Sequence, residues 1–152
     1  GRMSVREIVE HPGSVTILPI TADGDILLVR QYRYAIERDL LEIPAGLLEP
    51  GETPEEAARR ELREETGHEA GKLQLITGCF PAAGFSNERQ TRFLATNCVP
   101  VAYDADPDEG ITIVRIPVAG LKSRLVADSE LFQDGKTGFC LLWYAWSVQK
   151  SI

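Results

Sequence analysis

The chain has 152 residues, of which 43% are hydrophobic and 26% charged, which is enough apolar content for one domain with a packed core and excludes a disordered chain. Its formal net charge of −7 argues against general nucleic-acid binding and against adhesion to an anionic membrane, because both need a basic surface. An anionic substrate would therefore need a bound cation to bring it into its site.

Strand patterns are spread from residue 14 to residue 116, and two helical patterns follow late. Alternating or β-branched runs predict six strands, and Asp23-Gly24 between the first two is typical of a hairpin. No repeat or Gly/Ser-rich linker divides the chain, so we expect a single domain over residues 1–152. The fold class is α/β, a mixed sheet flanked by helices. The predicted strands are residues 14–20, 25–32, 40–43, 73–80, 89–96 and 111–116, and the late helices are residues 118–126 and 138–148.

A further helix, from Pro54 to Thr66, is predicted with well-marked ends. Thr53 is a good N-cap, and Pro54 suits the first helical position. Glu56 completes a capping box three residues after Thr53, and Gly67 can supply the left-handed stop.

The region around this helix is strongly acidic. From residue 46 to residue 68 it holds seven glutamates and three arginines, a balance of −4 in a chain of net charge −7. A solvated helix laced with ion pairs is the simplest interpretation, because opposite charges lie four residues apart. These pairs are Glu55 with Arg59, Glu56 with Arg60, and Arg60 with Glu64.

One face of the helix does not fit that interpretation. Glu61 and Glu65 are like charges four residues apart, with Glu64 three from Glu61, and each such repulsion costs a few tenths of a kcal/mol, roughly 0.3. Hard divalent cations take oxygen ligands, and Mg²⁺ is held by one or two carboxylates together with substrate phosphates and waters. The carbonyl of Ala45, in the turn before the helix, could face the same ions. The pattern predicts a cation site with open positions, as catalysis requires.

The same residues resemble a known motif. The spacing of these residues resembles the Nudix box of the Nudix hydrolases, with Gly46, Glu52 and Arg60 through Gly67 at the matching positions. The one departure is the final position of the box, which is normally aliphatic and is His68 here. We expect His68 to be a partly exposed surface residue. The resemblance implies an α/β/α sandwich in which the box forms loop, helix and loop, and hydrolysis of a nucleoside diphosphate linked to another group.

The resemblance also implies roles for individual residues. Glu52 with Arg60 would be a structural brace that orients the loop. The cation would be Mg²⁺ or Mn²⁺. Its implied ligands are the Ala45 carbonyl, Glu61, Glu64 and Glu65, with Glu64 also a catalytic helper.

The chain also resembles the ADP-ribose pyrophosphatase branch of the family outside the box. The similar segments are residues 29–33, 41–46 and 80–88, the last of which includes Pro81. That likeness implies cleavage of ADP-ribose to AMP and ribose 5-phosphate, with Arg33 near the substrate and Glu42 able to approach the terminal sugar. Arg33 offers a forked donor suited to a diphosphate, or it is a strand-edge arginine in water. Phe85 could stack on the base or close the pocket, or it is simply packed.

A general base is also needed, since the helix carboxylates would hold cations. Residues 104–109 place four acids in six positions, and the branch often carries its catalytic glutamate on this loop, so Glu109 is the first candidate and Glu88 the second. The alternative for the acidic loop is a solvated turn. The cations would neutralise the diphosphate and lower the pKa of a bound water, while Glu109 or Glu88 takes a proton.

Assembly and location complete these expectations. We expect a homodimer, although only residues 3–12 precede the first core strand and branch members commonly have a longer N-terminal β-region that builds the dimer. Residues 1–2 are interpreted as left over from expression. Three widely spaced cysteines without a CxxC pattern indicate neither a disulfide framework nor a zinc site and favour a cytoplasmic location.

Two alternatives stay open. A Nudix hydrolase of nucleoside triphosphates or GDP-sugars would share the metal ligands and differ in the pocket. A catalytically silent module would keep the fold and sense a nucleotide or Ca²⁺. The three glutamates of the helix face argue against silence, because a protein without catalysis has no reason to keep repelling charges.

Overall fold

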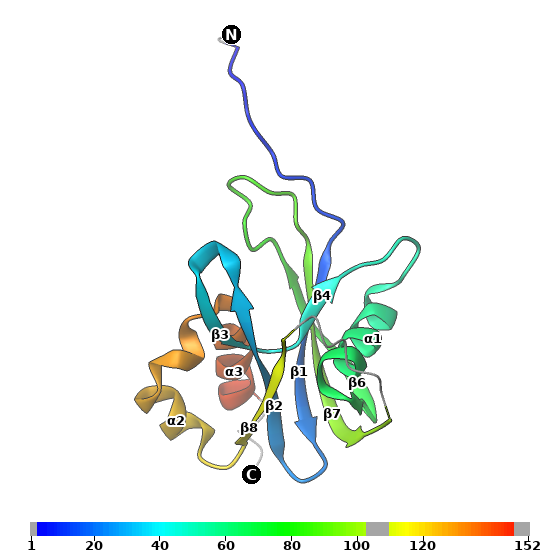
Figure 1. The fold of residues 1–152 in the computed structure, drawn as a ribbon, viewed down its shortest axis with the longest axis vertical. Coiled ribbons are helices and arrows are strands. Elements are labelled where there is room, and N and C mark those ends of the chain that lie inside the picture. The colour runs from blue at the N-terminus through cyan, green and yellow to red at the C-terminus, as the bar shows by residue number, and fades with distance from the viewer. Residues whose placement is uncertain (1–2, 103–109, 148–152) are drawn as a thin grey trace.

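The computed structural model describes residues 3–102 and 110–147, and its body is an eight-stranded mixed sheet (Figure 1). The strands are β1 (Ser14–Thr21), β2 (Asp25–Arg33), β3 (Arg38–Glu42), β4 (Ala45–Leu47), β5 (His68–Glu69), β6 (Lys72–Cys79), β7 (Gln90–Pro100) and β8 (Thr112–Pro117). Its main path is β3-β2-β1-β7-β5, with β4 paired to β1, β6 to β7 and β8 to β2. β1 runs parallel to β7, whereas its pairs with β2 and β4 are antiparallel. The predicted mixed sheet is therefore confirmed.

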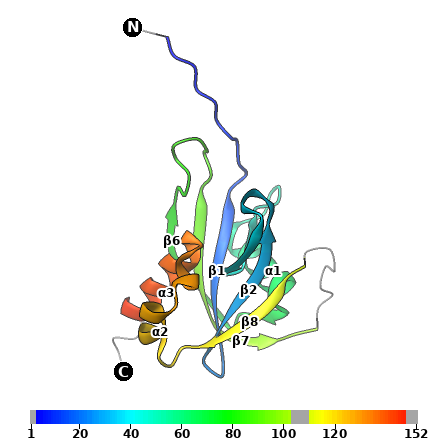
Figure 2. The ribbon, with the colours of Figure 1, turned by 60° about the vertical axis from the view of Figure 1, so that its left-hand side comes forward.

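Helices cover both faces of the sheet (Figures 1 and 2). On one side lies α1 (Pro54–Thr66). On the other side lie α2 (Leu121–Ala127) and α3 (Gly135–Ser147), joined by the 3₁₀ helix η2 (Ser129–Phe132). A second 3₁₀ helix, η1 (Tyr34–Ile36), closes the hairpin between β2 and β3. The predicted α/β/α sandwich is confirmed.

Strand β1 lies at the centre and is buried along its whole length. Val15 and Ile17 belong to the core under α1, whereas Leu18 and Ile20 belong to the core shared with α2 and α3. Because side chains of a strand alternate between faces, a central strand covered on both sides needs a continuous apolar run. This burial fixes β1 and with it the turn residues that pair with it.

The six predicted strands are all present, with changed ends. β7 continues to Pro100, past Asn97 in the left-handed region at φ 54°. The sequence did not predict β4 and β5, because strands of three and two residues are too short to show an alternating pattern.

The two late helices also differ in their bounds from the prediction. α2 begins at Leu121, directly after Gly120, whose φ is 76°. α3 begins at Gly135, three residues earlier than predicted, because the Asp134 carboxylate accepts a hydrogen bond from the Thr137 amide at 3.0 Å and caps the helix. Residue 148, the predicted end of this helix, lies outside the described residues. Within residues 3–102 and 110–147, every helix falls short of the length and apolar character that a membrane span requires.

Candidate active site

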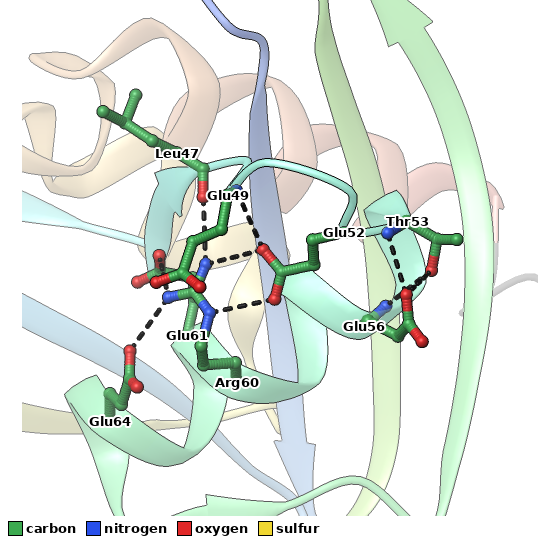
Figure 3. Close-up of polar contacts among 8 residues, drawn as sticks. All are labelled: Leu47, Glu49, Glu52, Thr53, Glu56, Arg60, Glu61 and Glu64. Carbon is green, nitrogen blue, oxygen red and sulfur yellow. Dashed lines mark hydrogen bonds and ion pairs between the residues drawn. The ribbon is translucent and has the colours of Figure 1, made fainter.

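Helix α1 has the ends that its sequence predicts. The Thr53 hydroxyl accepts a hydrogen bond from the Glu56 amide at 3.3 Å, and the Glu56 carboxylate accepts one from the Thr53 amide at 2.8 Å (Figure 3). Gly67 follows the helix with φ 63°, a left-handed conformation that glycine adopts without strain. The Glu56 carboxylate also accepts a hydrogen bond from the Thr53 hydroxyl at 2.6 Å, and the hydroxyl and the amide of Thr53 together hold the pKa of Glu56 below its ordinary value. The predicted capping box is confirmed.

Arg60 is the centre of the polar contacts in this region (Figure 3). Its Nε and Nη2 donate to the two carboxylate oxygens of Glu52, each at 2.9 Å, and Nη2 also donates to the Leu47 carbonyl at 3.0 Å. These bonds tie the loop before α1 to the helix. They also lower the pKa of Glu52 and raise the pKa of Arg60. The pair has the geometry of a brace, and Arg60 is turned toward Glu52 rather than toward Glu56.

Arg60 also contacts the acidic face of α1. Its Nη1 donates to Glu61 Oε1 at 2.7 Å and to Glu64 Oε2 at 3.0 Å (Figure 3). The guanidinium thus offsets part of the repulsion that the spacing of the glutamates implies. The predicted pair of Arg60 with Glu64 is confirmed, as is that of Glu55 with Arg59 at 3.1 Å.

Glu65 faces the turn before the helix rather than Arg60. It is 9% exposed, and its Oε2 accepts a hydrogen bond from the Ala45 amide at 3.1 Å. Glu64, by contrast, has a side chain 54% exposed. Among the residues that the structure describes, no three acidic, histidine or cysteine side chains already converge to hold a metal. The three glutamates therefore share a helix face without forming a preassembled set.

A cleft of about 460 Å³ lies beside this helix. Glu61 and Glu65 line it from α1, Arg33 lines it from the end of β2, and Ala45 and Gly46 line it from β4. An ideal Cβ on Gly46 would fall 1.9 Å from the Glu61 carboxylate carbon, so only glycine lets the turn approach that side chain. Carboxylate oxygens beside a close-packed backbone turn are donors that a hard divalent cation prefers. The residues present fit such an ion in their chemistry.

Arg33 is held at the cleft by Glu42 on the neighbouring strand β3. Its Nε donates to Glu42 Oε1 at 2.6 Å and its Nη2 to Oε2 at 2.8 Å. Arg33 is paired in this way although its side chain is 42% exposed, so it is more than a solvated strand-edge residue. Burial alone would raise the pKa of Glu42, which is 1% exposed, but hydrogen bonds from Arg33 and the charge of Lys136 outweigh it and hold that pKa below its ordinary value.

The family model that matches the chain is described as the NUDIX domain, and it matches residues 10–129. The chain belongs to the NUDIX domain family. An ADP-ribose pyrophosphatase of Bacillus subtilis (strain 168) is 41% identical to this Nudix chain over 143 residues, which are 93% of the chain and 76% of that protein. The predicted family, and the likeness to its ADP-ribose pyrophosphatase branch, are confirmed.

Two further comparisons bear on the family. A methanol dehydrogenase activator of Bacillus methanolicus is 46% identical over 118 residues, which are 76% of this chain and 64% of that protein, so the chain spans slightly less than two thirds of its length. A crystal structure of an ADP compounds hydrolase matches with a TM-score of 0.77 and 27% identity, covering 92% of this chain and 75% of that one. The fold is therefore that of a Nudix protein.

The loop between β6 and β7 carries two residues that the sequence proposes for the site. Phe85 is 61% exposed, and its carbonyl accepts a hydrogen bond from the Val9 amide at 2.8 Å. Glu88 is half-buried, and its Oε1 accepts a hydrogen bond from the Ser14 hydroxyl at 2.6 Å. Neither is among the described residues that line the cleft. Glu109, the other candidate base, lies outside the described residues.

His68, the unusual last residue of the Nudix box, is not the partly exposed residue that the sequence suggests. It is 4% exposed, with Nδ1 2.6 Å from the Thr66 carbonyl and Nε2 3.2 Å from Arg115 Nη2. The carbonyl requires a proton on Nδ1, so Nε2 accepts from Arg115. The prediction is wrong because His68 begins β5 and pairs with Pro100 of β7, which places the ring inside the fold.

Lys136 is a residue of this region that was not predicted from the sequence. This residue lies in the first turn of α3, and its Nζ pairs with the buried Glu42 and, at 3.1 Å, with Asp134. No local signal points to it, because 94 residues separate Lys136 from Glu42 in the chain. Only the packing of α3 against β3 brings them together.

Proposed function

We propose that this Nudix protein hydrolyses the pyrophosphate bond of a nucleoside diphosphate derivative, and that ADP-ribose is cleaved to AMP and ribose 5-phosphate. The observation that carries the proposal is a single cleft lined both by Glu61 and Glu65 and by Arg33. The likeness to an ADP-ribose pyrophosphatase and to an ADP compounds hydrolase supports the same substrate class.

The acidic side of the cleft would hold Mg²⁺ or Mn²⁺ through Glu61, Glu65 and Glu64, with the Ala45 carbonyl as a further oxygen donor. A divalent cation bound there supplies charge neutralisation for a diphosphate and a water of lowered pKa. Glu61 is brought against the turn by Gly46, and Glu65 is oriented by the Ala45 amide. The backbone of the turn thus constrains both carboxylates, and the Arg60 guanidinium also holds Glu61.

Arg33, which lines the same cleft, would bind the substrate anion. Arg33 presents a forked donor, which suits the oxygens of a diphosphate, and Glu42 fixes its orientation. In a chain of net charge −7, such a fixed cation matters for admitting an anionic ligand. Glu42 is 1% exposed and acts in this proposal through Arg33, while contacts of Glu42 with the terminal sugar and of Phe85 with the base stay predictions, because neither residue is among the described residues that line the cleft.

For the general base we propose Glu109, with Glu88 as the second candidate. Glu88 already accepts a hydrogen bond from Ser14, which ties it to β1. Glu109→Gln should lower kcat with little loss of metal affinity, whereas Glu88→Gln should leave kcat close to wild type. The opposite result would assign the role to Glu88.

A substrate panel with Mg²⁺ tests the proposed function. ADP-ribose, a GDP-sugar and a nucleoside triphosphate are incubated separately with the protein, and the products are resolved by chromatography. We expect AMP and ribose 5-phosphate to form fastest. Faster cleavage of the GDP-sugar or the triphosphate would assign that compound as the substrate in place of ADP-ribose. If the protein binds one of the three compounds and cleaves none, it is a silent module.

The methanol dehydrogenase activator among the relatives favours a second candidate, stimulation of a dehydrogenase. Wild-type protein and Glu61→Gln are each added to a purified methanol dehydrogenase, and its rate is measured. Stimulation by wild type alone would link this effect to the acidic cleft, and stimulation by both would make it a binding effect. Absence of stimulation would remove this candidate.

We also propose a homodimer in the cytoplasm, without a nucleic-acid or membrane partner. Residues 3–8 extend away from the body of the molecule (Figure 1), and Met3, Val5 and Ile8 on this segment are exposed. A second copy that covers these apolar side chains would remove them from water. The three free cysteines support a reducing compartment. Sedimentation velocity tests the dimer, and a monomer at micromolar concentration would contradict it.

A further inference from the structure

The charged residues behind Arg33 form a chain that reaches into the first turn of α3. Arg33 pairs with Glu42, Glu42 also pairs with Lys136, and Lys136 pairs with Asp134 at 3.1 Å. The signs alternate along this chain, so its four charges balance. Of these four residues, only Arg33 lines the cleft; the Glu42 side chain is 2% exposed, and those of Lys136 and Asp134 are each 14% exposed. Three mostly buried groups therefore stand behind one accessible cation.

The same turn of α3 is fixed by hydrogen bonds of its own. Asp134 Oδ2 accepts from the Thr137 amide at 3.0 Å and from the Thr137 hydroxyl at 2.5 Å. The Thr137 hydroxyl in turn accepts from the Ile43 amide at 2.8 Å. Ile43 follows Glu42 and precedes the turn that leads to the cleft. One helix turn thus holds both the side chain of Glu42 and the backbone beside it.

From these contacts we propose that Lys136 is a positioning residue for the substrate site, acting through Glu42 on Arg33. Lys136 shares Oε2 of Glu42 with Nη2 of Arg33. This shared oxygen keeps the carboxylate anchored to α3 and leaves the guanidinium only partly neutralised. A diphosphate that approaches the cleft therefore meets a cation that is fixed in direction and still carries net charge.

Removal of the Lys136 charge has two consequences for the site. Glu42 keeps Arg33 as its cation but loses its anchor on α3, so the pair can move together. The four-residue chain also changes from a balance of zero to −1, which opposes an anionic ligand in a partly buried place. Both consequences weaken binding of the diphosphate without touching the carboxylates of α1.

The proposal rests on the proposed function, and its test compares KM with kcat for ADP-ribose at saturating Mg²⁺. Lys136→Met should raise KM about tenfold, on the scale of a lost charge-assisted contact, with a much smaller change in kcat. Lys136→Arg keeps the charge and should restore most of the affinity. Lys72→Met, at an exposed lysine of β6, is the matched control and should leave both constants unchanged. If Lys136→Met does not fold, Lys136→Gln, which retains a polar head, takes its place.

A double variant tests whether Lys136 acts through Arg33. If it does, Arg33→Ala with Lys136→Met should have a KM within about twofold of Arg33→Ala alone, because Lys136 then has no Arg33 guanidinium to position. The proposal would be overturned if the KM increases of the two single variants multiply in the double variant. It would also be overturned if Lys136→Met has the KM of wild type.

Calorimetric titration with ADP-ribose in the absence of divalent cations gives a second readout besides activity. The proposal predicts weaker binding to Lys136→Met than to wild type. If wild type neither binds nor cleaves ADP-ribose, the proposed function fails and this inference with it. If wild type cleaves ADP-ribose and the variants match it in KM and Kd, only the positioning role fails.

Discussion

The backbone of Gly46 lies against the carboxylate of Glu61. A Cβ on Gly46 would fall 1.9 Å from Glu61 Cδ and Oε1 and 2.3 Å from Oε2, far inside any real contact distance. Gly46 belongs to β4, which pairs with the buried strand β1, so the turn cannot retreat. The Glu61 side chain is the flexible partner and would have to move instead. The glycine therefore fixes where Glu61 places its oxygens in the cleft.

Gly46→Ala should abolish most ADP-ribose hydrolysis while the fold survives, because the new methyl group displaces the Glu61 carboxylate rather than the backbone. The measurements are kcat with Mg²⁺ and the midpoint of thermal unfolding. Gly78→Ala is the control, since a Cβ there would have its nearest neighbour at 3.8 Å, and it should retain activity. Normal turnover in Gly46→Ala would show that this contact does not matter for the site.

Arg33→Ala should raise KM for ADP-ribose about tenfold or more, with a smaller effect on kcat, because it removes the forked donor while the metal ligands stay. The variant also leaves Glu42 with Lys136 alone, so thermal unfolding is measured in parallel. Arg124→Ala on α2, where the arginine pairs only loosely with Asp128 at 3.9 Å, serves as the control. An unaltered KM in Arg33→Ala would place this residue outside the binding site.

Thr53→Ala should lower the free energy of unfolding by about 1 kcal/mol, because it removes the side-chain half of the capping box at the start of α1. Urea unfolding followed by circular dichroism measures this change. Ser123→Ala, at an exposed position of α2, should leave stability as it is. Equal stability of Thr53→Ala and wild type would mean that α1 does not depend on its cap.

The stability of the fold should fall in acid through Glu42. The pKa of this carboxyl is held below its ordinary value of 4.5, so the unfolded chain binds the proton more readily than the folded one. Its contribution is complete above the ordinary value and is lost as the pH falls through the lower, folded pKa. Urea unfolding across this acid range should show a steeper decline for wild type than for Glu42→Gln. Parallel declines would contradict this linkage, since Glu52 and Glu56 remain in both proteins.

Helix α1 was predictable from the sequence because every signal for it is local. Thr53 and Glu56 are three residues apart, and Gly67 follows the last turn directly, so the ends Pro54–Thr66 agree with the prediction. The start of α3 was less accessible. Gly135 and Gly138 are poor helix formers, and the Asp134 side chain supplies the cap that outweighs them.

The environment of the site residues was harder to predict, because it depends on contacts between distant parts of the chain. Glu42 could be assigned to the strand before the turn, but its pairing with Lys136 depends on how α3 packs on β3. His68 follows a helix stop, which suggests exposure, yet pairing with β7 turns its ring inward. Arg60 was expected to brace Glu52 and to pair with Glu64, whereas its further contact with Glu61 follows only from the geometry of the guanidinium.

The acidic face of α1 is the central element of the proposed function, and divalent-cation dependence tests it most directly. ADP-ribose hydrolysis is measured across a titration of Mg²⁺ and of Mn²⁺ for wild type, Glu61→Gln and Glu65→Gln. Glu55→Gln is the matched control, because Glu55 pairs with Arg59 at the exposed start of the same helix.

We predict that wild type and Glu55→Gln form AMP in proportion to bound cation until saturation. Glu61→Gln and Glu65→Gln should lose about a hundredfold or more in kcat, the scale expected when a group that stabilises developing charge is removed. Near-normal turnover in both variants, or full wild-type activity in the presence of a chelator, would contradict the assignment of this helix face as the cation site.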